Sequence, residues 1–304
     1  MNDLRERVPG HSLVDELLRQ WDVGAIRIDP ESDAVIIDDE AVSWYRGVIG
    51  ERRVAELLSH LGSAWTVLHS VPVGRGTSDI DHVVLGPAGV FTINTKYSPG
   101  KKVWVGGYGI YVDGFPQQYV RNSVNEAARA SDLLSRAVGM TVPVTGLIVF
   151  VNAGSITRKA PAGGGIDTPT IEVLRDVELL TTFAARPIFS AEQVARIVDQ
   201  AVLPGTWHQA PQTSTIGRHI SREFEALETA VGPRLAQPIA RPIPSLTPTQ
   251  QRPSRPVASR PAARRPSRGR KPRQSALEKL IGGLLGPVAA AAIGWTMLNY
   301  FSQR

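Results

Sequence analysis

Apolar and polar residues recur along the chain with two different periods, and each period predicts one type of secondary structure. Helical spacing of apolar residues predicts helices over Ser12–Trp21, Ala41–Leu61, Gln117–Val138, Val177–Ala184 and Ala191–Val202. Short apolar runs between turn residues predict strands over Trp65–Val71, Ile80–Leu85, Val90–Thr95, Lys102–Val105, Ile110–Val112, Val144–Asn152 and Thr170–Leu174. The run Val144–Asn152 is continuously apolar, which is typical of a strand buried on both faces. This order predicts an α/β domain in which helices flank a mixed sheet.

Composition divides the chain into four parts. We expect an N-terminal extension over residues 1–40, a folded domain over 41–205, a largely disordered linker over 206–275 and an apolar helix over 280–301. Proline and arginine are interleaved in the linker, and such a sequence cannot bury enough apolar surface to fold, so it favours polyproline II or disorder. The N-terminal extension lacks the apolar core of a signal peptide, so no export signal is expected there.

The apolar segment 280–301 predicts a transmembrane helix, because an uncharged run of about 20 residues is long enough to cross a bilayer. The alternative is a buried or amphipathic helix of a soluble protein. Small residues recur every four positions at Gly282, Gly286, Ala290 and Gly294, a pattern that lets membrane helices pack closely and predicts a homo-oligomer. The basic linker on the N-terminal side predicts a single-pass protein of the cell membrane with its folded domain in the cytoplasm.

The positive charge of the chain is concentrated in the linker. The whole chain carries a formal charge of +6, yet residues 233–275 contain 11 basic residues and no acidic one. Subtracting these charges and the net +1 of residues 276–304 leaves −6 for residues 1–232. The basic linker could contact anionic lipid headgroups, bind nucleic acid through phosphates, or serve only as a solvated spacer. We favour a spacer that adheres to the membrane, because no aromatic residues are interleaved for base stacking.

The sequence has no cysteine, which excludes disulfides and cysteine-based zinc sites. Its candidate chemistry lies in two short strands joined by a tight turn, between Ser78 and Gly100. Asp81 begins the first strand, and Asn94 and Lys96 lie two apart on the second, so these two point to the same face. Carboxylates on adjacent strands can hold a divalent ion, and a nearby lysine can neutralise phosphate oxygens.

These strands belong to a longer set of motifs. The set comprises Gly50-Glu51, Asp79-Ile80-Asp81-His82-Val83-Val84, Gly89-Val90-Phe91, Thr95-Lys96 and Gly100. In this spacing the chain, over roughly residues 45–180, resembles the nuclease-related domain family (NERD), which is grouped with the PD-(D/E)xK, restriction-endonuclease-like fold. The resemblance implies a restriction-endonuclease-like sheet with Asp81 as the metal-binding acid, Lys96 as the catalytic lysine and Glu51 as an acid supplied by a helix.

The family pattern usually has glutamate two positions before the lysine, where this chain has Asn94. An amide oxygen can still ligate a metal but brings no charge. We therefore expect Asp81, Glu51 and Asn94 to hold Mg²⁺ or Mn²⁺, with a weaker affinity than a third carboxylate would give.

Other polar residues have competing interpretations. Asp81 can also cap a turn, and Lys96 can simply extend to solvent. Asp79 is expected to bond to nearby backbone. His82 faces the opposite side of the strand from Asp81 and is expected to be structural. Gln117, Gln118 and Arg121 open a predicted helix, where related nucleases place groups that contact the substrate; ordinary polarity at a helix start is the alternative.

Together these features predict a membrane-tethered, metal-dependent nuclease-like protein that hydrolyses phosphodiester bonds in DNA or RNA. The alternative is a catalytically weak or inactive module of the same fold that binds nucleic acid or a protein partner at the membrane. A purely structural membrane protein is a third class. Asn94 and the acidic charge of the folded part favour inactivity, whereas Asp81, Lys96 and Glu51 favour the enzyme.

Overall fold

A five-stranded mixed sheet forms the centre of the fold. The computed structural model describes residues 3–29, 31, 35–106, 109–160, 169–209, 224–225 and 227–229. The strands follow the order β11 (Ile171–Arg175), β9 (Val144–Val151), β5 (Gly89–Tyr97), β4 (Asp79–Gly86) and β3 (Thr66–Pro72). The pairs β11–β9 and β9–β5 are parallel, while β5–β4 and β4–β3 are antiparallel. The expected α/β class with a mixed sheet flanked by helices is confirmed.

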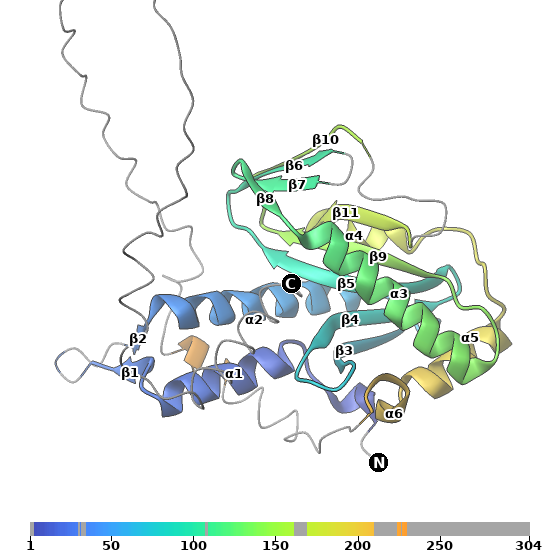
Figure 1. The fold of residues 1–304 in the computed structure, drawn as a ribbon, viewed down its shortest axis with the longest axis horizontal. Coiled ribbons are helices and arrows are strands. Elements are labelled where there is room, and N and C mark those ends of the chain that lie inside the picture. The colour runs from blue at the N-terminus through green and yellow to red at the C-terminus, as the bar shows by residue number, and fades with distance from the viewer. Residues whose placement is uncertain are drawn as a thin grey trace, which may run out of the picture. The chain divides into compact units, whose positions relative to one another are not determined.

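Helices cover both faces of this sheet (Figure 1). On one face α2 (Asp39–Leu58) packs with α4 (Leu179–Thr182), and on the other α3 (Tyr119–Val138) packs with α5 (Ala191–Ala201). Gly50 allows α2 to approach β5 closely, because a Cβ there would lie only 3.1 Å from the Cβ of Tyr97.

Strand β9, the second of the five, is buried along nearly its whole length, as its continuous apolar run predicts. Its neighbours β11 and β5 and the helices on either face of the sheet shield it from solvent. The predicted helices over Ala41–Leu61, Gln117–Val138 and Ala191–Val202 are confirmed as α2, α3 and α5.

A second sheet has four strands, three of which lie in sequence between β5 and α3. Its order is β10 (Ser155–Arg158), β6 (Lys102–Gly106), β7 (Gly109–Val112) and β8 (Phe115–Gln117), with β10 parallel to β6 and the other pairs antiparallel. The sequence pattern predicts β6 and β7 but neither edge strand. Strand β8 is short and contains Pro116, and β10 has Ile156 as its one apolar residue, so neither gives a periodic signal.

The N-terminal residues pack onto the domain. The short helix η1 (Leu4–Glu6) contacts β3, and the amide of Leu4 donates a hydrogen bond to the carbonyl of Val202. Helix α1 (His11–Asp22) packs against α2, next to the hairpin of β1 (Ile26–Ile28) and β2 (Val35–Ile37). The segments η2 (Asp176–Glu178) and α6 (Pro204–Trp207) complete the described elements.

Phe224 and Leu227 of the predicted linker join this N-terminal core. Phe224 is buried, with its ring 5.5 Å from that of Tyr45, and the guanidinium of Arg52 lies 5.0 Å from the Phe224 ring centre. Phe224 therefore packs on α2.

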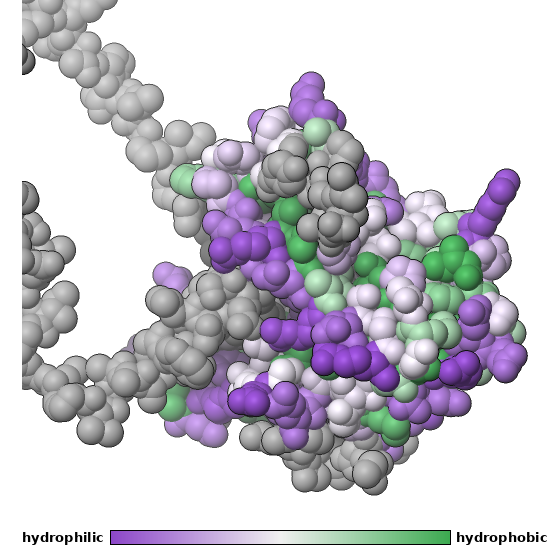
Figure 2. Space-filling view, turned by 45° about the vertical axis from the view of Figure 1, so that its right-hand side comes forward, coloured by the Kyte–Doolittle hydropathy of each residue, from purple (hydrophilic) through white to green (hydrophobic). Residues whose placement is uncertain are grey.

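On the outer surface, hydrophobic side chains form separate patches among hydrophilic ones (Figure 2). Within the described part of the chain, no helix combines the length and apolar character needed to span a membrane. The predicted transmembrane helix over 280–301, its small-residue stripe and most of the predicted linker lie outside the described residues.

Candidate functional site

The strands β4 and β5 separate at the residues singled out by the sequence. Their pairing runs from Gly86–Gly89 to His82–Ile93, after which β5 continues along β9. Just beyond the last pair, the Oδ2 of Asp81 accepts a hydrogen bond of 2.7 Å from the backbone amide of Thr95. The Asp81 side chain is 4% exposed. A buried carboxylate is thus fixed against the backbone between Asn94 and Lys96.

Asn94 contacts a carboxylate that the sequence analysis did not single out. Its Nδ2 donates a hydrogen bond of 2.9 Å to the Oε1 of Glu126, which projects from α3. The same amide leaves Oδ1 buried and without a hydrogen-bond partner among the described residues. Because the amide nitrogen is occupied by Glu126, the free acceptor of Asn94 is its oxygen, the atom that ligates metal ions.

More buried polar groups surround this contact. Thr92 Oγ1, Asn122 Nδ2 and Ser123 Oγ are also buried without partners among the described residues. We call Thr92, Asn94, Asn122, Ser123 and Glu126 the β5–α3 polar cluster. An unpartnered buried polar atom costs about 1–3 kcal/mol, so an apolar interface would be more stable here. A cluster of this kind fits a place where a polar ligand binds.

A glycine brings the helix close to the sheet at this cluster. Gly146 of β9 pairs with Thr92, and a Cβ at Gly146 would lie 2.6 Å from Ser123 Oγ. The missing side chain lets the polar side of α3 sit directly on β5 and β9.

Lys96 lies at the open end of the cluster. Its Nζ is 4.9 Å from the ring centre of Tyr119, the first residue of α3, in a cation–π arrangement. Gln118 precedes that residue and Arg121 follows it by two, and both side chains are exposed. The structure therefore brings Lys96, Gln118 and Arg121 to the same end of α3. Burial raises the pKa of Tyr119, so its ring stays neutral beside the ammonium group.

Glu51 lies on α2, which covers the opposite face of the sheet from α3. It is 2% exposed, and its Oε2 accepts a hydrogen bond of 3.0 Å from the backbone amide of Gly10. The amide of the next residue, His11, donates to Ser70 Oγ on β3 at 3.0 Å. Glu51 thus joins α2 to the start of α1 close to the sheet.

The motif residues His82 and Asp79 both lie on β4 and interact with residues outside the candidate site. His82 is fully buried, and its Nδ1 lies 2.8 Å from the Nδ1 of His69, so one ring donates a hydrogen bond to the other. Burial lowers the pKa of both rings, that of His69 to about 4. Asp79 pairs with Pro72 at the end of the β3–β4 ladder, and its carboxylate counteracts the lowering of the Arg7 pKa by burial.

The oxygen atoms of this site are of the types that bind a hard divalent ion, although one of the three residues that offer them is uncharged. Asp81, Asn94 and Glu126 offer carboxylate and amide oxygens, the ligand types that Mg²⁺ and Mn²⁺ prefer. The buried, unpartnered Oδ1 of Asn94 is the observation that fits such an ion. Across the described residues, no group of three or more His, Cys, Asp or Glu is arranged to hold a metal ion, so the Asn94 oxygen would be a third protein ligand beside the carboxylates of Asp81 and Glu126.

The site residues that the sequence analysis missed are Thr92 of β5 and, on α3, Tyr119, Asn122, Ser123 and Glu126. A signal for those on α3 exists: Tyr119, Asn122, Ser123 and Glu126 follow one another at helical spacing. They interrupt the apolar stripe of that helix with polar groups, which marks a polar contact rather than core.

Comparisons with known proteins agree with the motif. Residues 46–151, roughly a third of the chain, match the model of the nuclease-related domain, NERD, so the resemblance is confirmed. This interval holds all of the site residues above except Gly10, His11 and Arg7 of the N-terminal region. Searches of curated proteins and of solved structures gave no match.

Proposed function

We propose that this domain is a metal-dependent phosphodiesterase of the restriction-endonuclease-like type, acting on nucleic acid at the junction of β4, β5 and α3. The single observation that carries the proposal is the Asp81–Thr95 hydrogen bond, which fixes a buried carboxylate beside Asn94 and Lys96. The nuclease-related family of residues 46–151 supports the same function.

Asp81, Asn94 and Glu126 would hold a Mg²⁺ or Mn²⁺ ion, with Glu51 as a further candidate ligand from the sequence motif. When bound, the ion supplies charge stabilisation for the reacting phosphate. Asp81 and Glu126 bring two negative charges, and the hydrogen bond from Asn94 orients the Glu126 carboxylate. In this assignment Glu126 provides the charge that glutamate usually provides at the position of Asn94.

Lys96 acts on the phosphate rather than on the ion. Its ammonium group neutralises a non-bridging oxygen as negative charge develops, and the Tyr119 ring restricts the directions that the side chain can take. Gln118 and Arg121, exposed at the same end of α3, contact the flanking backbone of the substrate.

A second candidate function is a nucleic-acid-binding module without catalysis. The observation that favours it is the neutral Asn94 at a position where the family usually has glutamate, with one of its amide atoms already engaged by Glu126. Such a module would keep the cluster but bind a divalent ion too weakly to cleave.

One assay separates the two functions. The full-length protein is incubated with single- and double-stranded DNA and RNA, with Mg²⁺, Mn²⁺ or EDTA, alongside the variants Asp81→Asn and Lys96→Ala. Metal-dependent cleavage that both variants lose supports the enzyme. Cleavage that survives both substitutions refutes the site, and binding without cleavage in every condition supports the inactive module.

Membrane attachment through residues 280–301 is a separate proposal and rests on the sequence alone. Fractionation of cells that express the full chain, compared with a chain ending at residue 275, tests it. Recovery of the full chain in the supernatant would refute the anchor.

A further inference from the structure

The small sheet presents two aromatic rings to solvent on one face. Trp104 of β6 is 41% exposed and Tyr111 of β7 is 39% exposed. They are direct cross-strand partners, and their ring centres lie 5.4 Å apart with an angle of 71° between the ring planes. Large aromatic side chains usually bury most of their surface, so an exposed pair in contact marks a surface with a partner.

Paired glycines let both rings lie along the sheet. Gly106 and Gly109 face each other next to the aromatic pair. A Cβ at Gly106 would lie 2.1 Å from Trp104 Cη2, and a Cβ at Gly109 would lie 3.1 Å from Tyr111 Cε2. The rings therefore occupy the space that side chains would fill at these glycines, and each extends over the neighbouring backbone.

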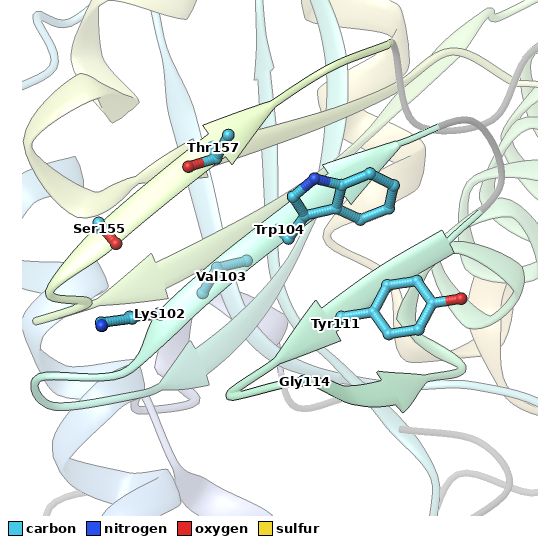
Figure 3. Close-up of a pocket in the computed structure, with 7 residues that line it drawn as sticks. All are labelled: Lys102, Val103, Trp104, Tyr111, Gly114, Ser155 and Thr157. Carbon is cyan, nitrogen blue, oxygen red and sulfur yellow. The ribbon is translucent and has the colours of Figure 1, made fainter.

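A shallow cavity of about 500 Å³ continues from the aromatic pair along the same face. Figure 3 shows the two rings side by side on neighbouring strands, with Ser155 and Thr157 of β10 beyond Trp104 and Lys102 at the near end of β6. The cavity thus has aromatic surface at one side and hydroxyl and ammonium groups at the other.

The segment around the aromatic pair carries a net positive charge, whereas the folded part of the chain is acidic. Residues 98–125 contain Lys101, Lys102 and Arg121 against a single acid, Asp113, although residues 1–232 carry −6 overall. Lys102 lines the cavity beside the aromatic pair, Lys101 is exposed just before it in the chain, and Lys159 follows two residues after Thr157. The local charge is complementary to phosphate.

We propose that this surface, the Trp104–Tyr111 face, binds single-stranded nucleic acid by stacking bases on the two rings while Lys101 and Lys102 contact phosphates. Aromatic platforms with flanking cations hold single strands, because every base has a π face and every linkage a charge. A double helix buries its base faces and cannot stack on these rings. The inference rests on the proposed function and narrows its substrate class to single strands.

Three strands of the small sheet lie in sequence between two residues of the candidate site. The chain enters the sheet six residues after Lys96, and it leaves β8 two residues before Tyr119. The two residues that make the cation–π contact therefore flank the inserted strands in sequence, and the start of α3 packs against the inner face of the small sheet, formed by Val103, Val105, Ile110 and Val112.

Binding is measured on the full-length protein in EDTA, so that cleavage cannot interfere. Fluorescence anisotropy gives the dissociation constants of labelled dT15, U15 and a 15-base-pair duplex for the wild type and for Trp104→Ala, Trp104→Phe, Tyr111→Ala and Lys102→Ala. The matched control is Trp21→Ala, since Trp21 is 43% exposed on α1, away from this face. Circular dichroism and thermal unfolding check that each variant is folded.

We expect each alanine substitution of an aromatic residue to weaken single-strand binding about tenfold or more. Trp104→Phe should keep most of the affinity, and Trp21→Ala all of it. Lys102→Ala should reduce the slope of log affinity against log salt by roughly 0.7, the value for one phosphate contact on a single strand.

Equal affinity of Trp104→Ala and wild type for dT15 and U15 would overturn the proposal, as would a preference for the duplex. The outcome is independent of catalysis. If the protein never cleaves but the aromatic variants lose binding, the Trp104–Tyr111 face is supported and the proposed phosphodiesterase activity is refuted. If the protein cleaves but the aromatic variants bind as the wild type does, the activity is supported and the binding face is refuted.

Discussion

The side-chain amide of Asn94 donates a 2.9 Å hydrogen bond to the carboxylate of Glu126. These residues lie 32 positions apart, one on the strand β5 and the other on the helix α3. The contact places a negative charge beside Asn94, because the carboxylate that strand β5 lacks at this position is supplied by the facing helix α3.

Glu126→Gln is expected to weaken Mn²⁺ binding about 10- to 100-fold, the range found when groups that support a metal site are altered. The amide keeps the size of the side chain but removes its charge. Isothermal titration with Mn²⁺ measures the affinity without relying on activity. The matched control is Asp132→Asn, which removes the charge of an exposed carboxylate on the same helix. Equal affinity in Glu126→Gln and Asp132→Asn would contradict the assignment.

Asp81→Asn and Asp81→Leu separate the structural role of this residue from its chemical role. The asparagine oxygen can still accept the hydrogen bond from the Thr95 amide, so we expect a stable fold with metal binding and cleavage lost. Leucine leaves that buried amide without an acceptor and should cost about 1–3 kcal/mol of unfolding free energy in addition. Urea unfolding measures the stability of all three proteins, and we expect the leucine variant to be the least stable. Equal stability of the two variants would show that the hydrogen bond contributes little.

Tyr119→Leu should lower kcat/KM for cleavage several-fold, whereas Tyr119→Phe should leave it near the wild-type value. The phenylalanine ring still lies under Lys96, and a cation–π contact at such a site is worth about 0.5–2 kcal/mol. Steady-state kinetics on one oligonucleotide gives the comparison. A loss in the phenylalanine variant as large as in the leucine variant would assign the effect to the hydroxyl group instead.

Glu51→Gln tests whether the helix-borne acid serves the metal or the fold. The glutamine oxygen can still accept the hydrogen bond from Gly10, so stability should change little, while Glu51→Ala should lose about 1–3 kcal/mol. Unfolding curves and Mn²⁺ titrations of both variants are compared. A normal Mn²⁺ affinity in Glu51→Gln would remove Glu51 from the metal site and leave it a structural residue.

His11 makes the stability depend on pH. Burial and the nearby Arg7 lower its pKa from 6.5 to about 4, although Asp15 lies 3.9 Å away. Below pH 6.5 the unfolded chain binds a proton that the folded chain excludes, so unfolding becomes easier as the pH falls from 6.5 to about 4.

The variant His11→Gln cannot take up this proton and should lose less stability over that interval, by up to about 1.4 kcal/mol per pH unit. Urea unfolding at about pH 7 and about pH 5.5, on either side of the ordinary histidine pKa, measures the difference. Parallel losses in the wild type and the variant would mean that other groups, such as His69, account for the pH dependence.

The elements that carry a strong local signal could be predicted from the sequence alone. The helices α2, α3 and α5 and the buried strand β9 follow from apolar periodicity, because each buries a long and regular face. The Asp81, Asn94 and Lys96 motif also follows from sequence, since a tight turn and the apolar pattern of both strands set the register in which the two strands pair. The spacing of the motifs was enough to suggest the nuclease-related family.

The residues that complete the site could be identified only from the packing of distant elements against one another. Glu126 and Tyr119 reach β5 because α3 crosses the sheet after the three inserted strands β6, β7 and β8, and no local pattern encodes that crossing. The exposed Trp104–Tyr111 pair likewise depends on the pairing of β6 with β7, in which two glycines leave room for the rings. Contacts between residues far apart in the chain arise from packing of whole elements. The sequence therefore predicted the candidate catalytic residues Asp81, Asn94 and Lys96, whereas the fold determined which side chains contact them.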